Sequence, residues 1–310
     1  MRIVEIEALG VRGLRDASFT LSPERGGPGH VTVVTGPPQA GLTTFLDAIA
    51  LSAGRLAASG TSPGADEALR AGGMTATIRT TWWLDPDERA FGGTHDETLK
   101  AEVVFKRNEL GRADADPALL GLMSRYDHSA AISKVVSIPA RRISDGGFPA
   151  FIDFEVDQQY KRLADGPERF AGVPLALAKH SLGLGERARF EDVQRLFAEL
   201  CDSVQLVGAN AALQPEFALP SGIRVTLSRL SFAERNAFVL AALPVLLGLQ
   251  RSIILLDTPE LGLPPGLAGR WLSALRAYAP EAQWIVATRD PAVVESVEPA
   301  ARIQLTRGTP

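Results

Sequence analysis

A glycine-rich segment near the N-terminus has the residue types and spacing of a loop that binds phosphate. Residues 36–44 read G-P-P-Q-A-G-L-T-T, which meets the pattern G-x-x-x-x-G-K-[ST] at Gly36, Gly41 and Thr43. In such loops backbone N–H groups surround the phosphates, the lysine carries positive charge and the hydroxyl binds Mg²⁺. Leu42 occupies the lysine position here, and its isobutyl group offers a phosphate neither charge nor hydrogen bond.

A second candidate for this chemistry is a carboxylate that follows an apolar run. Residues 253–257 read I-I-L-L-D, a pattern typical of a strand that is buried on both faces. At the C-terminal end of such a strand, the Asp257 carboxylate can bind the Mg²⁺ that the Thr43 hydroxyl also holds. The alternative is that Asp257 only ends the strand, because many α/β strands end in this way.

Hydrophobic periodicity predicts the elements that would position these residues. We expect strands at 2–9, 17–21, 31–34, 75–84, 101–106, 223–227, 252–256, 283–287 and 302–305. Helices are expected from residue 43 onwards and at 148–163, 186–201, 231–249, 267–278 and 291–297, with turns at 85–94. The order strand, glycine-rich loop, helix is the one a phosphate-binding loop requires. Alternating buried strands and helices near the C-terminus predict a parallel sheet.

Three further phrases accompany these two segments. Residues 10–16 read G-V-R-G-L-R-D, residues 230–234 read L-S-F-A-E and residues 287–291 read A-T-R-D-P. Together with 36–44 and 257–265 (D-T-P-E-L-G-L-P-P), they resemble five motifs of the RecF, SMC and OLD branch of ABC-type P-loop ATPases, in the same order. These motifs are N-F-R-G-L-K-D, the P-loop, the signature L-S-x-G-E, D-E-P-E-x-x-L-H-P and the switch A-T-H-[SD]-P.

The resemblance implies an α/β ABC ATPase head with a mostly parallel central sheet, an N-terminal antiparallel β layer and an inserted helical lobe. We expect residues 1–310 to form a single domain, with residues 108–220 as the approximate lobe. The implied nucleotide-binding positions are Gly36, Gly41, Thr43, Thr44 and Arg12. The implied signature positions are Ser231, Ala233 and Glu234, and the implied Mg²⁺ ligands are Thr43 and Asp257.

The departures from the family pattern fall on its catalytic positions. Leu42 replaces the lysine, Ala233 the signature glycine, Thr258 the carboxylate that activates water, and Arg289 the switch histidine. A charged hydrogen bond contributes roughly 1.5–3 kcal/mol, so losing the lysine weakens binding about ten- to a hundredfold. Losing a positioned acid or base lowers the rate by about 10²–10⁴. We therefore expect weak or absent binding of ATP and Mg²⁺ and no efficient hydrolysis.

These substitutions predict a pseudo-ATPase that acts as a binding or scaffolding subunit of a larger complex. Family heads assemble face to face, so the expected partners are proteins, in a homo- or hetero-oligomer. One alternative is a slow ATPase, with Arg289 or another basic residue in the lysine's role. A further alternative is a DNA-processing subunit in which this head positions a separately encoded nuclease. Arg289 could instead pair with Asp257 or Glu260. Ser231 and Glu234 have the spacing of a helix capping box.

Composition narrows the class of protein. The formal net charge of −4 does not favour nucleic acid, although Arg141 and Arg142 offer a local alternative. Cys201 is the single cysteine, so no internal disulfide forms. The N-terminus lacks the layout of a signal peptide, and the longest apolar stretch, 237–249, is too short to span a bilayer. We expect a cytoplasmic protein without membrane insertion.

Overall fold

The computed structural model describes residues 1–21, 30–57, 68–126, 129–143, 154–164, 166–264 and 266–307. Its strands are β1 (Arg2–Leu9), β2 (Ala17–Thr20), β3 (Val31–Thr35), β4 (Thr75–Trp83), β5 (Thr98–Lys106), β6 (Glu109–Ala115), β7 (Val135–Ile138), β8 (Gln205–Ala209), β9 (Pro215–Ala218), β10 (Arg224–Thr226), β11 (Ile253–Asp257), β12 (Gln283–Ala287) and β13 (Arg302–Gln304). Its helices are α1 (Leu42–Leu56), α3 (Pro86–Gly92), α4 (Pro117–Ser124), α5 (Phe154–Lys161), α6 (Val173–Ser181), α7 (Arg187–Leu200), α8 (Phe232–Leu246), α9 (Leu267–Tyr278) and α10 (Pro291–Glu295).

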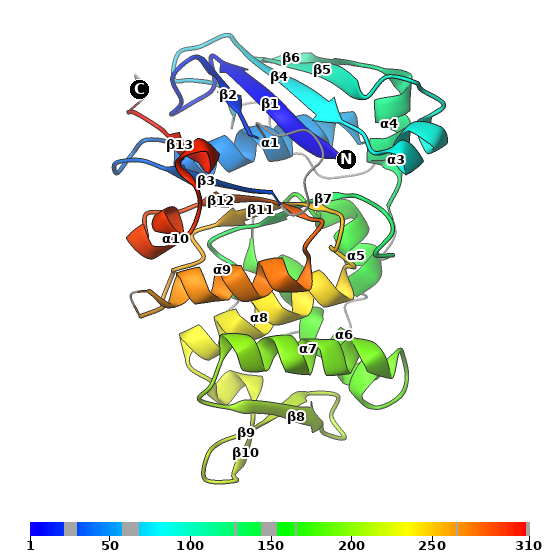
Figure 1. The fold of residues 1–310 in the computed structure, drawn as a ribbon, viewed down its shortest axis with the longest axis vertical. Coiled ribbons are helices and arrows are strands. Elements are labelled where there is room, and N and C mark those ends of the chain that lie inside the picture. Colours follow the sequence, from blue (N-terminus) through cyan, green and yellow to red (C-terminus); the bar gives the residue numbers. More distant parts are fainter. Residues whose placement is uncertain are drawn as a thin grey trace.

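The strands form three sheets that lie in layers (Figure 1). The central sheet has the order β13-β3-β12-β11-β7, and all its pairings are parallel. Helix α1 lies between this sheet and an antiparallel sheet of order β2-β1-β4-β5-β6 (Figure 1). Helices α8 and α9 cover the other face of the central sheet, and α7 separates them from the small sheet β10-β9-β8 (Figure 1). The predicted fold class is confirmed.

The central sheet is buried on both faces, as its apolar strands predict. In β11, Ile254 and Leu256 pack into the core on the side of α7 to α9. Ile253 and Leu255 pack into the core that contains α1 and the antiparallel sheet. Strand β11 is therefore packed on both sides. Its last residue, Asp257, has a fixed position at the edge of the sheet where the parallel strands end.

The predicted elements that carry long apolar patterns match the structure most closely. Strand β12 and helix α9 have the predicted bounds. The turn predicted at 85–94 is wrong, because Asp85 and Glu88 form a capping box there that begins helix α3. Strands β6, β7, β8 and β9 were not predicted. Helix α5 lies within the predicted 148–163, of which residues 148–153 lie outside the described residues.

The predicted assignment of 1–310 to one domain, with a lobe at 108–220, stays a prediction. Strand β6 pairs with β5 in the antiparallel sheet and β7 pairs with β11 in the parallel sheet.

Among the described residues, no helix is long and apolar enough to cross a membrane.

Candidate functional site

The glycine-rich loop connects β3 to α1, and two of its residues have a left-handed backbone. Gln39 and Gly41 have φ values of 67° and 86°, and such alternation of backbone handedness favours N–H groups that point towards an anion. A Cβ atom added to Gly41 would lie 2.5 Å from the carbonyl oxygen of Gly13, and one added to Gly36 would lie 2.8 Å from that of Leu305. Both glycines are therefore required by packing, and Gly13 and Leu14 lie directly against the loop at Gly41.

The side chain at the lysine position belongs to the hydrophobic core. Leu42 is 7% exposed and packs in the cluster that contains α1, whereas its neighbour Thr43 is exposed. A family lysine would carry its ammonium group into the loop. Leu42 instead contributes apolar burial and no charge.

The carboxylate of Asp257 and the hydroxyl of Thr43 lie together, as the sequence predicts. Asp257 is 4% exposed, and Thr43 Oγ1 donates a hydrogen bond of 2.9 Å to its Oδ2. The hydroxyl of Thr258 donates to the other carboxylate oxygen, Oδ1, at 2.8 Å. Each oxygen of Asp257 therefore already has a hydroxyl partner from this chain.

Thr258 stands where the water-activating carboxylate is expected, and its backbone is unusual. Its φ of 47° is a left-handed conformation that a β-branched residue adopts only at a cost of roughly 1–3 kcal/mol. Its N–H donates to the carbonyl of Ala287 at 2.8 Å. A hydroxyl that donates its proton to Asp257 does not act as a general base at neutral pH.

The switch segment approaches Glu260 through the backbone. The N–H of Arg289 donates to Glu260 Oε1 at 3.0 Å, and the Arg289 side chain is exposed. In the described part of the chain, the Arg289 guanidinium makes no ion pair with Asp257 or Glu260. The contact between these segments therefore uses the backbone of Arg289, and the charge pair considered from the sequence is not formed.

The signature segment begins helix α8. Ser231 accepts a hydrogen bond from the N–H of Glu234 at 3.3 Å, and the Glu234 carboxylate accepts one from the N–H of Ser231 at 2.7 Å. The predicted capping box is confirmed. Phe232 is 39% exposed, so an apolar ring stands at the surface next to Ala233.

Arg12 lies at the surface beside the first turns of α1. Its guanidinium is 3.6 Å from the carboxylate of Asp47, and its side chain is half exposed. An exposed ion pair of this kind holds a side chain weakly, so Arg12 is free to reorient.

Sequence reasoning missed the role of Arg142, which binds the backbone at Asp257 and Thr258. This side chain is 1% exposed, so the contact with nucleic acid considered for Arg142 is wrong. Its guanidinium donates to the carbonyls of Asp257 and Thr258, at 2.9 and 3.0 Å. Burial lowers the pKa of Arg142 to about 10, so it stays charged at neutral pH. The mostly apolar run of β7 ends just before Pro139. Predicting a strand there would have put Arg142 close to the end of a sheet strand.

The candidate Mg²⁺ ligands fit the metal only in part. Thr43 and Asp257 offer the oxygen atoms that Mg²⁺ prefers. Within the described ranges, however, no group of three or more His, Cys, Asp or Glu side chains could hold a metal. Mg²⁺ normally relies on substrate phosphates for further ligands, and Leu42 provides no charge to hold those phosphates.

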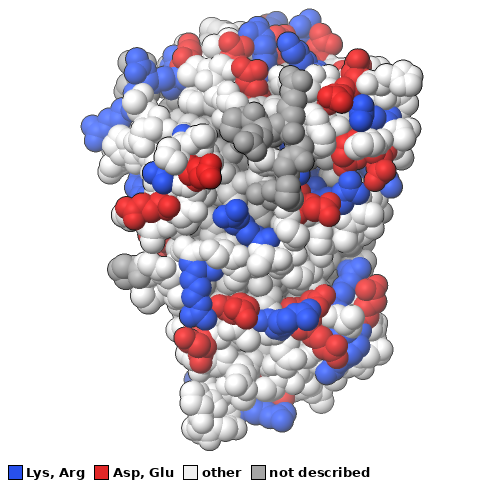
Figure 2. Space-filling view, viewed as in Figure 1, with Lys and Arg blue, Asp and Glu red and all other residues white. Residues whose placement is uncertain are grey.

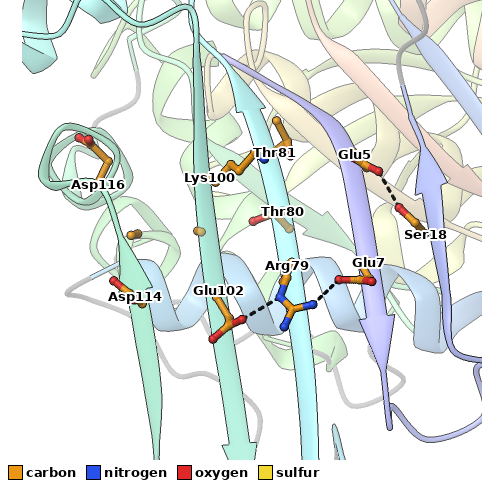
Figure 3. A pocket seen from close by; sticks show the side chains of 12 residues that line it. Glu5, Glu7, Ser18, Arg79, Thr80, Thr81, Lys100, Glu102, Asp114 and Asp116 are labelled. Carbon is orange, nitrogen blue, oxygen red and sulfur yellow. Dashed lines mark hydrogen bonds and ion pairs between the residues drawn. The ribbon is translucent and has the colours of Figure 1, made fainter.

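A separate depression of about 590 Å³ lies on the outer face of the antiparallel sheet (Figure 3). Arg79 lies between Glu7 and Glu102, at 2.7 Å from each carboxylate (Figure 3). The ion pairs with Arg79 and Arg112 lower the pKa of Glu102. The lining residues belong to none of the five motifs, and cross-strand ion pairs of this type are common on the solvated face of a sheet.

Comparison with known proteins identifies the fold. No family model matches the sequence, and no curated protein matches it. The SMC head domain from Thermotoga maritima superposes with a TM-score of 0.55 at 16% identity, covering 96% of this chain and 93% of that one. The chain has the fold of an SMC head domain. An SMC head bound to the C-terminal winged-helix domain of ScpA matches with a TM-score of 0.58 at 14% identity, covering 95% and 92%. A Pyrococcus furiosus SMC head structure with bound ScpA C-terminal domain gives 0.59 at 12% identity, covering 95% and 91%.

These similarities support the ABC-type P-loop ATPase fold that the five motifs imply. At 12–16% identity they carry the fold alone. Activity has to be inferred from the residues at the loop, at the end of β11 and in the switch.

Proposed function

We propose that the chain is a degenerate ABC-type ATPase head, a pseudo-ATPase that works as a binding or scaffolding subunit of a larger complex. The observation that carries this proposal is the burial of Leu42 in the hydrophobic core at the lysine position. A working loop needs a cation there to hold the β- and γ-phosphates. The loop keeps its glycine-rich backbone, but Leu42 brings no positive charge to it.

The other departures support the same conclusion. Thr258 donates its hydroxyl proton to Asp257 instead of accepting one from water. Arg289 contacts Glu260 through its backbone and cannot replace a histidine as a hydrogen-bond acceptor, because guanidinium has no acceptor. The binding of ATP and Mg²⁺ at Gly36, Gly41, Thr43, Thr44 and Asp257 is therefore proposed to be weak or absent.

The proposed partner is a protein. Two of the similar heads were solved in complex with a domain of ScpA, and an SMC-like head offers a face on which another protein can bind. Here the signature segment presents the exposed ring of Phe232 at the molecular surface. We propose homo- or hetero-oligomer formation through it. Nucleic acid is a weaker candidate, because Lys and Arg alternate with Asp and Glu on the face shown in Figure 2.

Calorimetry with ATP and Mg²⁺, combined with a phosphate-release assay, tests the pseudo-ATPase proposal. The loss of one charged hydrogen bond predicts binding about ten- to a hundredfold weaker than that of a loop with its lysine. We expect no affinity tighter than about 100 µM and no phosphate release above background. Tighter binding accompanied by release would overturn the proposal.

A second candidate function is a slow ATPase that positions a separate nuclease on DNA. The hydrogen bond between Thr43 and Asp257 favours it, because these two Mg²⁺ ligand positions still meet. A DNA mobility shift that decreases steeply with salt, in the presence of ATP, would support this candidate.

A further inference from the structure

The Arg142 guanidinium joins three segments that lie far apart in the sequence. It donates to the carbonyl of Pro139 at 2.9 Å, just after β7. It also donates to the carbonyls of Asp257 and Thr258 at the end of β11. Its Nε donates to the side-chain oxygen of Asn236 at 2.5 Å. All of its nitrogens have partners, although the side chain is almost entirely removed from water.

Asn236 continues this network from the signature helix. It lies in α8, two residues after Glu234, and is 1% exposed. Its amide nitrogen donates to the carbonyl of Leu261 at 3.2 Å. One side chain of α8 thus accepts from Arg142 and donates to the loop that follows β11.

The network also explains how Thr258 keeps its left-handed backbone. A strained residue of this kind persists only where its surroundings fix it. The N–H of Thr258 is bound by Ala287, its hydroxyl by Asp257 and its carbonyl by Arg142. Of these, the bond from Arg142 is the one that brings a positive charge to this end of β11.

We propose that Arg142 and Asn236 form a buried clamp that fixes the signature helix to the end of β11, where the guanidinium supplies positive charge that Mg²⁺ would otherwise supply. In a working head, the ion held at the Asp position neutralises charge at this point. Here the Arg142 guanidinium binds the backbone carbonyl of Asp257. The hydroxyls of Thr43 and Thr258 donate to the two carboxylate oxygens of the same residue. The clamp deepens the proposed function and rests on it, because a head held in this way keeps its conformation without nucleotide.

Arg169 provides a matched control. It is also 1% exposed, and its guanidinium donates to Gln158 and to the carbonyls of Ser137 and Ala164. None of these contacts reaches Asp257 or α8. Replacing Arg169 removes a buried charge of the same type without opening the candidate site.

The test compares thermal unfolding of the wild type, Arg142→Gln and Arg169→Gln, each with EDTA and with Mg²⁺ but no nucleotide. Without its cation, the Asp257 site should attract the metal, so about 10 mM Mg²⁺ is expected to raise the Tm of Arg142→Gln by about 2–4 °C. The wild type and Arg169→Gln should not respond. A Tm rise in the wild type, or equal behaviour of the two variants, would overturn the clamp.

Two milder variants keep the test decisive if Arg142→Gln does not fold. Asn236→Ala retains the charge but releases α8, so amide exchange in the first turns of α8 and at residues 258–261 should rise about tenfold without a gain in Mg²⁺ response. Arg142→Lys keeps the charge with fewer donors and should behave in the same way. Unchanged exchange in both variants would refute the clamp. Wild-type ATP binding tighter than about 100 µM, accompanied by phosphate release, would refute the pseudo-ATPase proposal alone, so the two failures are distinguishable.

Discussion

The substitution Leu42→Lys restores the missing residue of the phosphate-binding pattern and is the most direct perturbation of the site. Leu42 is 7% exposed, and full burial of a leucine side chain contributes about 1.5–3 kcal/mol. A lysine would lose most of this contribution. A lysine stem can extend towards solvent, which spares the ammonium from full burial. We expect a decrease of about 2–4 kcal/mol in the free energy of unfolding.

Urea unfolding, followed by circular dichroism, measures this change, and a phosphate-release assay measures activity. Leu42→Met conserves volume and apolarity, so it should cost less than about 1.5 kcal/mol and serves as the control. The double variant Leu42→Lys/Thr258→Glu restores both the cation and the acid. It is expected to remain without ATPase activity, because Glu at position 258 inherits a left-handed backbone and lies beside the Asp257 carboxylate.

One result would refute this reasoning. If Leu42→Lys were as stable as the wild type and gained both an ATP-dependent rise in Tm and phosphate release, the loop would be intact. Leu42 would then be a tolerated exception in a functional site, and its burial would have no bearing on activity.

Three other substitutions test the supports of the site. Gly41→Ala should destabilise the protein by more than about 1 kcal/mol, because its new Cβ meets a backbone carbonyl 2.5 Å away; Gly183→Ala, also at positive φ but in open space, should cost less in the same urea titration. Ser231→Ala removes the cap of α8 and should cost about 0.5–2 kcal/mol, measured by thermal unfolding. The backbone N–H of Gly10 and the Arg70 guanidinium lower the pKa of Asp16 below 3.8. Its contribution to stability is therefore present above pH 3.8 and lost as pH falls through the lower folded-state pKa, so the Tm difference between wild type and Asp16→Asn should vanish there.

The elements that the sequence predicts best are those whose own residues show a hydrophobic pattern. Strand β12 has four apolar residues after Gln283, and α9 has an apolar side of the right period, so neither needs a partner to be recognised. Strand β7 has four residues and lies between irregular segments. It is a strand because β11 pairs with it, and that neighbour lies more than a hundred residues away in the chain.

In the candidate site too, one contact could be predicted from the sequence and another could not. The motif spacing was sufficient to predict that Thr43 meets Asp257, because the family pattern fixes which strand ends face the loop. The position of Arg142 depends on three segments that the sequence does not relate to one another. Burial with full hydrogen bonding is a property of the folded chain, and the same residue types are usually exposed.

The departures at positions 42 and 258 compensate each other in charge. Relative to the family pattern, Leu42 removes a positive charge and Thr258 removes a negative one, so the pair leaves the net charge of the site unchanged. A glutamate at 258 beside an uncharged residue 42 would place two carboxylates together at a buried strand end, which disfavours ionisation of both. With threonine there, Asp257 is the carboxylate at the strand end, held by two hydroxyls and backed by Arg142. The two substitutions are therefore linked physically, because a glutamate at position 258 without a lysine at position 42 would leave two carboxylates with no balancing cation in the loop.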